Sequence, residues 1–231
     1  MKRKWQIVLP SDFESTKKEY RLNGRQYQRV TSTLDIIAKP FLFGWYKRVG
    51  EEKANRVLET RQAIGVHVHK LCELTLQGEV FNLGTYETEI QEDMKQFNIF
   101  KVVCKLKAEG LEQRVWSNEY GYAGTADFVG YYQSYKKLMT RGHKTKFDKS
   151  SFVIGDWKTG KAFYRTYWLQ LAAYAMAFFE LTGVKVKGVF IARMRDGRLT
   201  VQEKTWEELM PEFEAYKHAL ALYKWEHRII D

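Results

Sequence analysis

An apolar run that ends in two opposite charges constrains this chain more than any other stretch. Residues 152–154 are apolar and predict a buried strand, and Asp156-Trp157-Lys158 follows almost directly. Alternate residues of a strand point to the same face, so Asp156 and Lys158 are expected side by side, roughly 7 Å apart along the strand. Gly160 then breaks the strand. The chain must therefore fold so that an acid and a lysine share one sheet face.

A carboxylate and an ammonium fixed in this way suit metal-assisted attack on a phosphodiester. The acid holds a divalent cation, and the lysine steadies the nucleophilic water and the negative charge of the transition state. The alternative is a surface ion pair on an edge strand. The position of Asp156 and Lys158, between an apolar strand and the turn at Thr159-Gly160, favours the catalytic interpretation.

A second acid lies in a similar setting. Residues 122–130 predict another strand bounded by glycines, and Asp127 is the only charged residue in it. Such a charge is costly to bury unless it is paired or bound to a metal. On neighbouring antiparallel strands, Asp127 and Asp156 could share one cation through their oxygens, as magnesium or manganese prefers. The alternative is a lone aspartate that faces solvent.

Upstream, Ile64, Val68 and Leu71 recur at helical spacing and predict a helix. His69 and Glu73 then lie on one face of that helix, one turn apart. A lone helical histidine is usually structural, so His69 becomes a candidate ligand only beside the other acids.

Four patterns follow one another in the chain: Gly65-x-x-x-His69, Gly124-Thr-x-Asp127, Asp156-x-Lys158 and Gln170-x-x-x-Tyr174. As an ordered set they resemble the RecB-like or Cas4-like exonuclease branch of the PD-(D/E)XK nuclease superfamily. The resemblance runs from about Val30 to Arg193 and is nearest to phage exonucleases and the mitochondrial genome maintenance exonuclease.

The resemblance implies a role for each matching position. Metal ligation falls to His69, Asp127, Asp156 and the main-chain carbonyl of Trp157. Lys158 is implied as the catalytic lysine, and Gln170 and Tyr174 as residues that position the lysine or the DNA. Glu73 matches the acid that many members carry on the first helix.

Cofactor expectations follow from the same comparison. Some members of the branch use four cysteines to hold an iron–sulfur cluster, but this chain contains only Cys72 and Cys104, too few for the usual ligand set. We therefore expect Mg²⁺ or Mn²⁺ and no iron–sulfur cluster. Cys72, among apolar helix residues, is expected to be a small core side chain.

Composition agrees with a polyanionic partner. The 231 residues carry a formal charge of +10, and no apolar run approaches a membrane span. The basic start Met1-Lys2-Arg3-Lys4 lacks a following apolar core, so we expect an intracellular protein, in the cytoplasm or, if viral, in that of the host. We expect one nuclease domain over 1–231, with an N-terminal hairpin and helical region (about 1–57) and a basic insertion (133–149).

The insertion contains six basic residues and one acidic residue, so its net charge is +5, which is half of the +10 of the whole chain. It is either a solvated hairpin tip or a DNA-tracking arm near the active site, with Lys136, Lys137, Lys144 and Lys146 on phosphates. Tyr164 and Trp168, close to the catalytic strand, are candidates for stacking on unpaired bases, although such residues more often simply pack.

The order of elements predicts an α/β fold, a restriction-endonuclease-like mixed central sheet flanked by helices. Strands are expected near 20–30, 115–132, 151–157, 185–193 and 198–204, with turns at Asn23-Gly24 and Asp196-Gly197. Helices are expected at 31–45 (interrupted near Pro40), 51–77, 167–181 and 206–225, and the segment 86–104 as a helix followed by a strand.

The function expected from these observations is a metal-dependent DNA nuclease that hydrolyses phosphodiester bonds. An exonuclease on single-stranded or end-containing DNA, in replication, recombination or repair, is the first expectation. A structure-selective DNA endonuclease and a non-catalytic DNA-binding module of the same fold are the alternatives.

Overall fold

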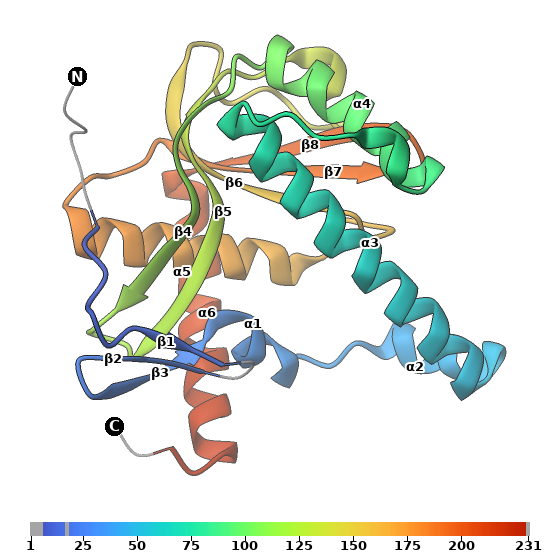
Figure 1. Cartoon of the computed structure of the whole chain (residues 1–231). Coiled ribbons are helices and arrows are strands. Elements are labelled where there is room, and N and C mark those ends of the chain that lie inside the picture. The colour runs from blue at the N-terminus through green and yellow to red at the C-terminus, as the bar shows by residue number, and fades with distance from the viewer. Residues whose placement is uncertain (1–6, 17–18, 230–231) are drawn as a thin grey trace.

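The computed structural model describes residues 7–16 and 19–229, and the basic start at residues 1–4 lies outside them. Within the described residues the chain forms one eight-stranded mixed sheet with helices on both faces, as the sequence predicts (Figure 1). No helix in this part of the chain is both long and apolar enough to cross a membrane.

The elements follow one another in a simple order. The strands are β1 (Glu14–Ser15), β2 (Glu19–Leu22), β3 (Arg25–Arg29), β4 (Lys107–Ser117), β5 (Tyr122–Tyr132), β6 (Ser151–Lys158), β7 (Gly188–Arg195) and β8 (Arg198–Thr205). The α-helices are α1 (Val30–Thr33), α2 (Pro40–Val49), α3 (Glu51–Gln77), α4 (Thr88–Val103), α5 (Arg165–Thr182) and α6 (Trp206–Glu226).

Strand β5 is the centre of the sheet. One edge of β5 pairs with β4 along its length, whereas the other edge pairs with β3 at Tyr122 and Ala123 and with β6 from Phe128 onward. Strands β6 and β7 are parallel, and β8 follows antiparallel at the far edge. Because β3 and β6 share one edge of β5 but leave residues 124–127 between them, the sheet forks at that point.

Both predicted hairpin turns are confirmed. Asn23 and Gly24 have φ values of 51° and 70°, and Asp196 and Gly197 have values of 53° and 65°. Two consecutive residues with positive φ define the type I′ turn, whose twist matches that of the strands it joins. The second turn brings β8 back along β7 and so fixes the register between them.

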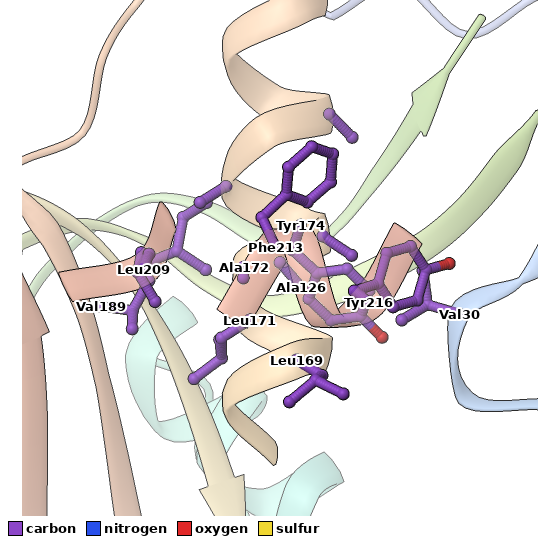
Figure 2. Packing of buried hydrophobic residues seen from close by; sticks show 14 of the residues in the cluster. Val30, Ala126, Leu169, Leu171, Ala172, Tyr174, Val189, Leu209, Phe213 and Tyr216 are labelled. Atoms are coloured by element: carbon purple, nitrogen blue, oxygen red, sulfur yellow. The ribbon is translucent and has the colours of Figure 1, made fainter. Parts of the chain in front are cut away.

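Two apolar layers cover the sheet. On one face the alanine-rich helix α5 and helix α6 pack through residues such as Leu171, Leu209 and Tyr216 (Figure 2). On the other face α3 and α4 pack through Val68, Phe97 and Trp157, among others. Cys72 lies in this second layer and is fully buried, as expected of a core side chain.

The expectation of a strand at the end of 86–104 is wrong. Helix α4 continues from Thr88 to Val103. Its buried residues Ile90, Met94, Phe97 and Phe100 recur every three or four positions, which is the helical period. The β-branched residues near its end, Ile99 and Val102, are exposed, and the packing of the other face against α3 and the sheet overrides their local preference.

Candidate active site

The end of β6 holds the acid and the lysine that the sequence singles out. Asp156 is buried, and its Oδ2 lies 2.7 Å from the Nζ of Lys158. Lys158 Nζ also donates to Oε1 of Gln170 at 3.2 Å, and its ammonium lies 4.7 Å from the centre of the Tyr167 ring. The lysine is thus held between a strand carboxylate, a helix amide and an aromatic face.

Helix α5 supplies the support for this pair. Gln170 Nε2 donates to Oδ1 of Asp156 at 3.4 Å and to the hydroxyl of Tyr174 at 3.1 Å. Gln170 and Tyr174 are one helical turn apart, so one face of α5 reaches the strand with both side chains. The structure therefore brings together Asp156, Lys158, Gln170 and Tyr174, as the sequence predicts.

Two glycines of the sequence patterns make room for this arrangement. A Cβ on Gly124 would lie 2.2 Å from the ring of Tyr174, so only glycine lets that ring cross β5. A Cβ on Gly65 would lie 3.2 Å from the hydroxyl of Thr159, where α3 approaches the end of β6. Gly124 permits the packing of α5 on the site, and Gly65 permits that of α3.

Asp127 lies at the fork of the sheet. Its Oδ2 accepts a hydrogen bond from the N–H of Trp157 at 2.8 Å, just beyond the last β5–β6 pair, Phe128 and Gly155. Ala126 packs in the α5/α6 layer and Phe128 in the α3/α4 layer, although residues two apart in a regular strand share a face. The strand therefore turns over at Asp127.

His69 reaches the same point from α3. Its Nδ1 lies 3.3 Å from Oδ2 of Asp127. Ligand atoms of His69, Asp127 and Glu112 all lie within 4.8 Å of one another. Glu112 stands on β4 between Leu111 and Gln113, whose partners are Phe128 and Ala126, so it is opposite Asp127.

Sequence reasoning missed Glu112. The signal that could have found it is an acid in a strand that pairs with the strand of Asp127, but β4 also contains Glu109 and basic residues and shows no clean alternation. Glu112 also adopts a positive φ of 44°, which no sequence pattern announces for a glutamate.

The electrostatics of the site reflect carboxylates that are close together. Burial, with a contribution from Asp127, raises the pKa of Asp156 to about 6 against the pull of Lys158. Desolvation, followed by repulsion from Asp127, raises the pKa of Glu112 to about 7. Burial also acts to raise the pKa of Asp127, but His69 and Lys158 outweigh it and lower that pKa. For His69, burial opposes protonation, yet Asp127 raises the pKa overall.

The clustered residues His69, Glu112 and Asp127 fit a divalent cation, and Asp156 lies outside the group whose ligand atoms are within 4.8 Å of one another. The donor set is an imidazole and carboxylate oxygens, which Mg²⁺ and Mn²⁺ accept. Asp127, Asp156 and Glu112 bring three negative charges when ionised, against the one fixed positive charge of Lys158. A divalent ion would balance the remainder and offset the burial and the repulsion that raise the pKa of Glu112 and Asp156.

Other expected site residues lie elsewhere. Glu73 is one turn beyond His69, and its carboxylate pairs with Lys70 at 2.7 Å. Trp168 is buried in the α5/α6 layer with Lys204 over its ring, so stacking on a base is ruled out unless the core opens. Tyr164 is half-buried and lines an apolar hollow near the end of β6.

The basic insertion leaves the sheet after β5, returns at Ser151 at the start of β6, and between these points runs beside β8. Met139 pairs with Val201, which lies in the same row of the sheet as Ala192 and Trp157. It is also tied down, because Glu203 accepts hydrogen bonds from Ser134 and from the main chain of Lys146. The expectation of an arm beside the active site, like its role in DNA binding, stays a prediction.

Comparisons with known proteins add little to this description. No protein-family model matches the chain, and no curated protein matches it. Among solved structures, the chain is similar to one described as the crystal structure of SSO0001, with 14% identity over 81% of this chain and 73% of that one. The TM-score is 0.39.

Proposed function

We propose that the chain is a metal-dependent DNA nuclease that hydrolyses phosphodiester bonds, acting as an exonuclease on single-stranded or end-containing DNA. The observation that carries the proposal is the placement of Lys158. Its ammonium contacts Asp156 at 2.7 Å and Gln170 at 3.2 Å, beside the His69–Asp127 pair. A purely structural ion pair needs neither a histidine nor two further carboxylates around it.

The residues would divide the chemistry among them. His69, Asp127, Asp156 and the carbonyl of Trp157 would hold Mg²⁺ or Mn²⁺, with Glu112 as a further oxygen donor. The ion, when bound, neutralises the scissile phosphate and makes water more acidic. Lys158 would orient the attacking water and stabilise the charge that grows on the phosphoryl oxygens. Water would form the new P–O bond and release a proton to solvent as the bond to the departing sugar oxygen breaks, and that oxygen would take a proton from solvent.

Gln170 and Tyr174 act as positioning residues in this scheme. Gln170 contacts Lys158 and Asp156 with its two amide atoms, so it fixes the lysine relative to the carboxylate. Tyr174 in turn accepts a hydrogen bond from Gln170. Misplacing a catalytic group by about 1 Å can cost on the order of 10²-fold in rate, so this support matters for turnover.

One assay tests the proposal. The purified protein is incubated with Mg²⁺ and end-labelled DNA, in linear and closed circular forms, single- and double-stranded, beside the Lys158→Ala variant. We expect linear single strands to be degraded progressively while closed circles survive. Rapid linearisation of circular single strands by the wild type alone would identify an endonuclease. No cleavage of any substrate with Mg²⁺ or Mn²⁺ would overturn the proposal.

A further inference from the structure

Two hollows adjoin beyond the end of β6. The first, of about 650 Å³, is lined by Lys161, Arg193, Arg195, Asp196, Arg198 and Thr200. The second, of about 510 Å³, lies between α2, α3 and the segment after β6. Lys161 and Arg195 line both hollows, so the two lie next to each other at these residues.

The register of the sheet places the basic hollow beside Lys158. Lys158 pairs with Arg193 on β7, and Arg193 pairs with Thr200 on β8. Directly paired residues share a face, and neighbouring strands lie about 4.8 Å apart. The row from Lys158 to Arg193 and Thr200 therefore leads from the proposed catalytic lysine into the hollow within two strand spacings.

The charge of this hollow is unbalanced. Four basic side chains line it against Asp196, which pairs with Arg195 at 3.3 Å. Among the described residues, neither Lys161 nor Arg198 has a carboxylate within ion-pairing distance. Nε of Arg193 and Oγ1 of Thr200 are buried and have no hydrogen-bond partner there. Unsatisfied buried donors carry a cost, which an anion that accepts from them would remove.

The second hollow is suited to a flat apolar group. Trp45 of α2 and Tyr164 line it together with Leu42, Val57 and Leu58. Val57 and Leu58 are 37% and 38% exposed on the outer half of α3, although both are large and apolar. Aromatic side chains beside a basic groove are the common platform for unpaired bases.

We infer that the two hollows together bind one nucleotide of a single strand, with its phosphate in the basic hollow and its base in the apolar one. The inference rests on the proposed function, since it places this nucleotide one step along the strand from the phosphate at Lys158. It places substrate binding at the end of β6 rather than at the basic insertion. An unpaired base is required, because a base inside a duplex has no free face to enter the apolar hollow.

Binding by fluorescence anisotropy tests the inference in the Lys158→Ala background, with a single-stranded oligonucleotide of about 12 nucleotides. Lys161→Ala/Arg198→Ala removes two exposed charges from the basic hollow. Lys185→Ala/Lys187→Ala removes two charges at the opposite end of β7 and is the matched control. We expect the first pair to weaken binding about tenfold and to lower the log–log salt slope by about 1.4, and the control to change neither. Equal losses in both pairs, or none in the first, would overturn the inference.

Trp45→Ala separates the base from the phosphate. It should weaken binding of the normal oligonucleotide roughly tenfold, and leave binding of a fully abasic strand unchanged, whereas the Lys161/Arg198 effect should persist on that strand. An equal effect of Trp45→Ala on both strands would overturn the placement of the base. Oligonucleotides with a 5′-phosphate, a 3′-phosphate or neither show whether the bound phosphate is terminal or internal. If these variants bind DNA normally while the wild type cleaves it, the nucleotide site is rejected and the proposed nuclease stands. If the variants lose DNA binding as expected but the wild type cleaves no DNA, only the proposed nuclease activity is rejected.

Discussion

The carboxylate of Asp127 accepts a hydrogen bond from the main-chain N–H of Trp157, 2.8 Å away, just past the last residue pair of the β5–β6 ladder. A side chain thus takes the place of a strand partner. This contact holds β6 at a fixed distance from β5 while leaving the carbonyl side of Trp157 outside the ladder. It also explains how Asp127 can be buried and ionised, because the N–H and His69 together offset its desolvation.

Asp156→Asn and Lys158→Ala are each expected to abolish cleavage and to leave the fold intact. Loss of a ligand carboxylate or of the transition-state charge costs about 10²–10³-fold or more in rate. Single-turnover kinetics with excess enzyme would measure the loss, and circular dichroism would report the fold. Near wild-type turnover by either folded variant would show that the site is wrongly assigned.

Chelation is expected to stop the reaction reversibly. Excess EDTA should remove activity and added Mg²⁺ or Mn²⁺ should restore it, and the protein should show no iron–sulfur absorbance. A cation that binds only the folded state also raises the melting temperature, a readout independent of activity. Asp127→Asn should lose that thermal shift. Activity that persists in EDTA, or stoichiometric iron and sulfide, would contradict the prediction.

Gly124→Ala is expected to lower activity by displacing Tyr174. The new methyl group would lie 2.2 Å from the tyrosine ring, so the ring must move and its hydrogen bond with Gln170 must break. Overpacking of this kind costs about 1–3 kcal/mol of stability. Gly44→Ala in α2 is the control, because nothing lies within 4 Å of its Cβ, and alanine there should stabilise the helix by about 1 kcal/mol. Full activity in Gly124→Ala would mean that Tyr174 has no positioning role.

Asp93→Asn is expected to stabilise the protein at high pH. Asp93 is fully buried, its Oδ2 has no hydrogen-bond partner in the described structure, and burial raises its pKa to about 6. The folded protein holds this proton more tightly than the unfolded chain, so the contribution of Asp93 to stability is greatest below pH ~4 and falls as the pH rises from there to about 6. The variant keeps an acceptor for the Gly197 N–H without the charge, so its advantage should reach about 1–3 kcal/mol above pH 6.

Urea unfolding of Asp93→Asn at pH 5 and pH 8 would measure this difference. Glu79→Gln, at an exposed acid that is not among the groups acting on Asp93, is the control and should show no such pH dependence. An equal effect of Asp93→Asn at the two pH values would show that the carboxylate is not the source.

Alanine at Lys136, Lys137, Lys144 and Lys146 tests the basic insertion. If DNA passes over it, each lost contact lowers the log–log salt slope by about 0.7–0.9 between roughly 50 and 200 mM salt. Lys146 already pairs with Glu208 at 2.6 Å, so we expect its single variant to contribute least. An unchanged salt slope in the quadruple variant would show that the insertion is a solvated hairpin tip that does not contact DNA.

The sequence predicted the fold class and the elements that carry strong local signals. Helix α3 and the turn at Asn23-Gly24 have periodic or turn-specific residues, so their positions follow from local chemistry. The Lys158–Asp156 pair followed from strand alternation. Glu112 did not, because its proximity to Asp127 depends on pairing between β4 and β5 and on an unusual backbone angle. The packing of the basic insertion against β8, through Met139 and Val201, did not follow either, because charge composition does not determine tertiary contacts.

The fork in β5 also has a consequence for how the protein folds. Gln28 pairs with Tyr122 across more than ninety residues of intervening chain, and β6 joins the same edge only later in the sequence. Contacts this distant pay a large loop-closure entropy and form slowly. The N-terminal hairpin can therefore pair with the sheet only after β5 has formed. Lys158 can reach its contact with Gln170 only after α5 has formed. During synthesis the proposed site would stay incomplete until Gln170 has left the ribosome, after His69 and Asp127 have emerged.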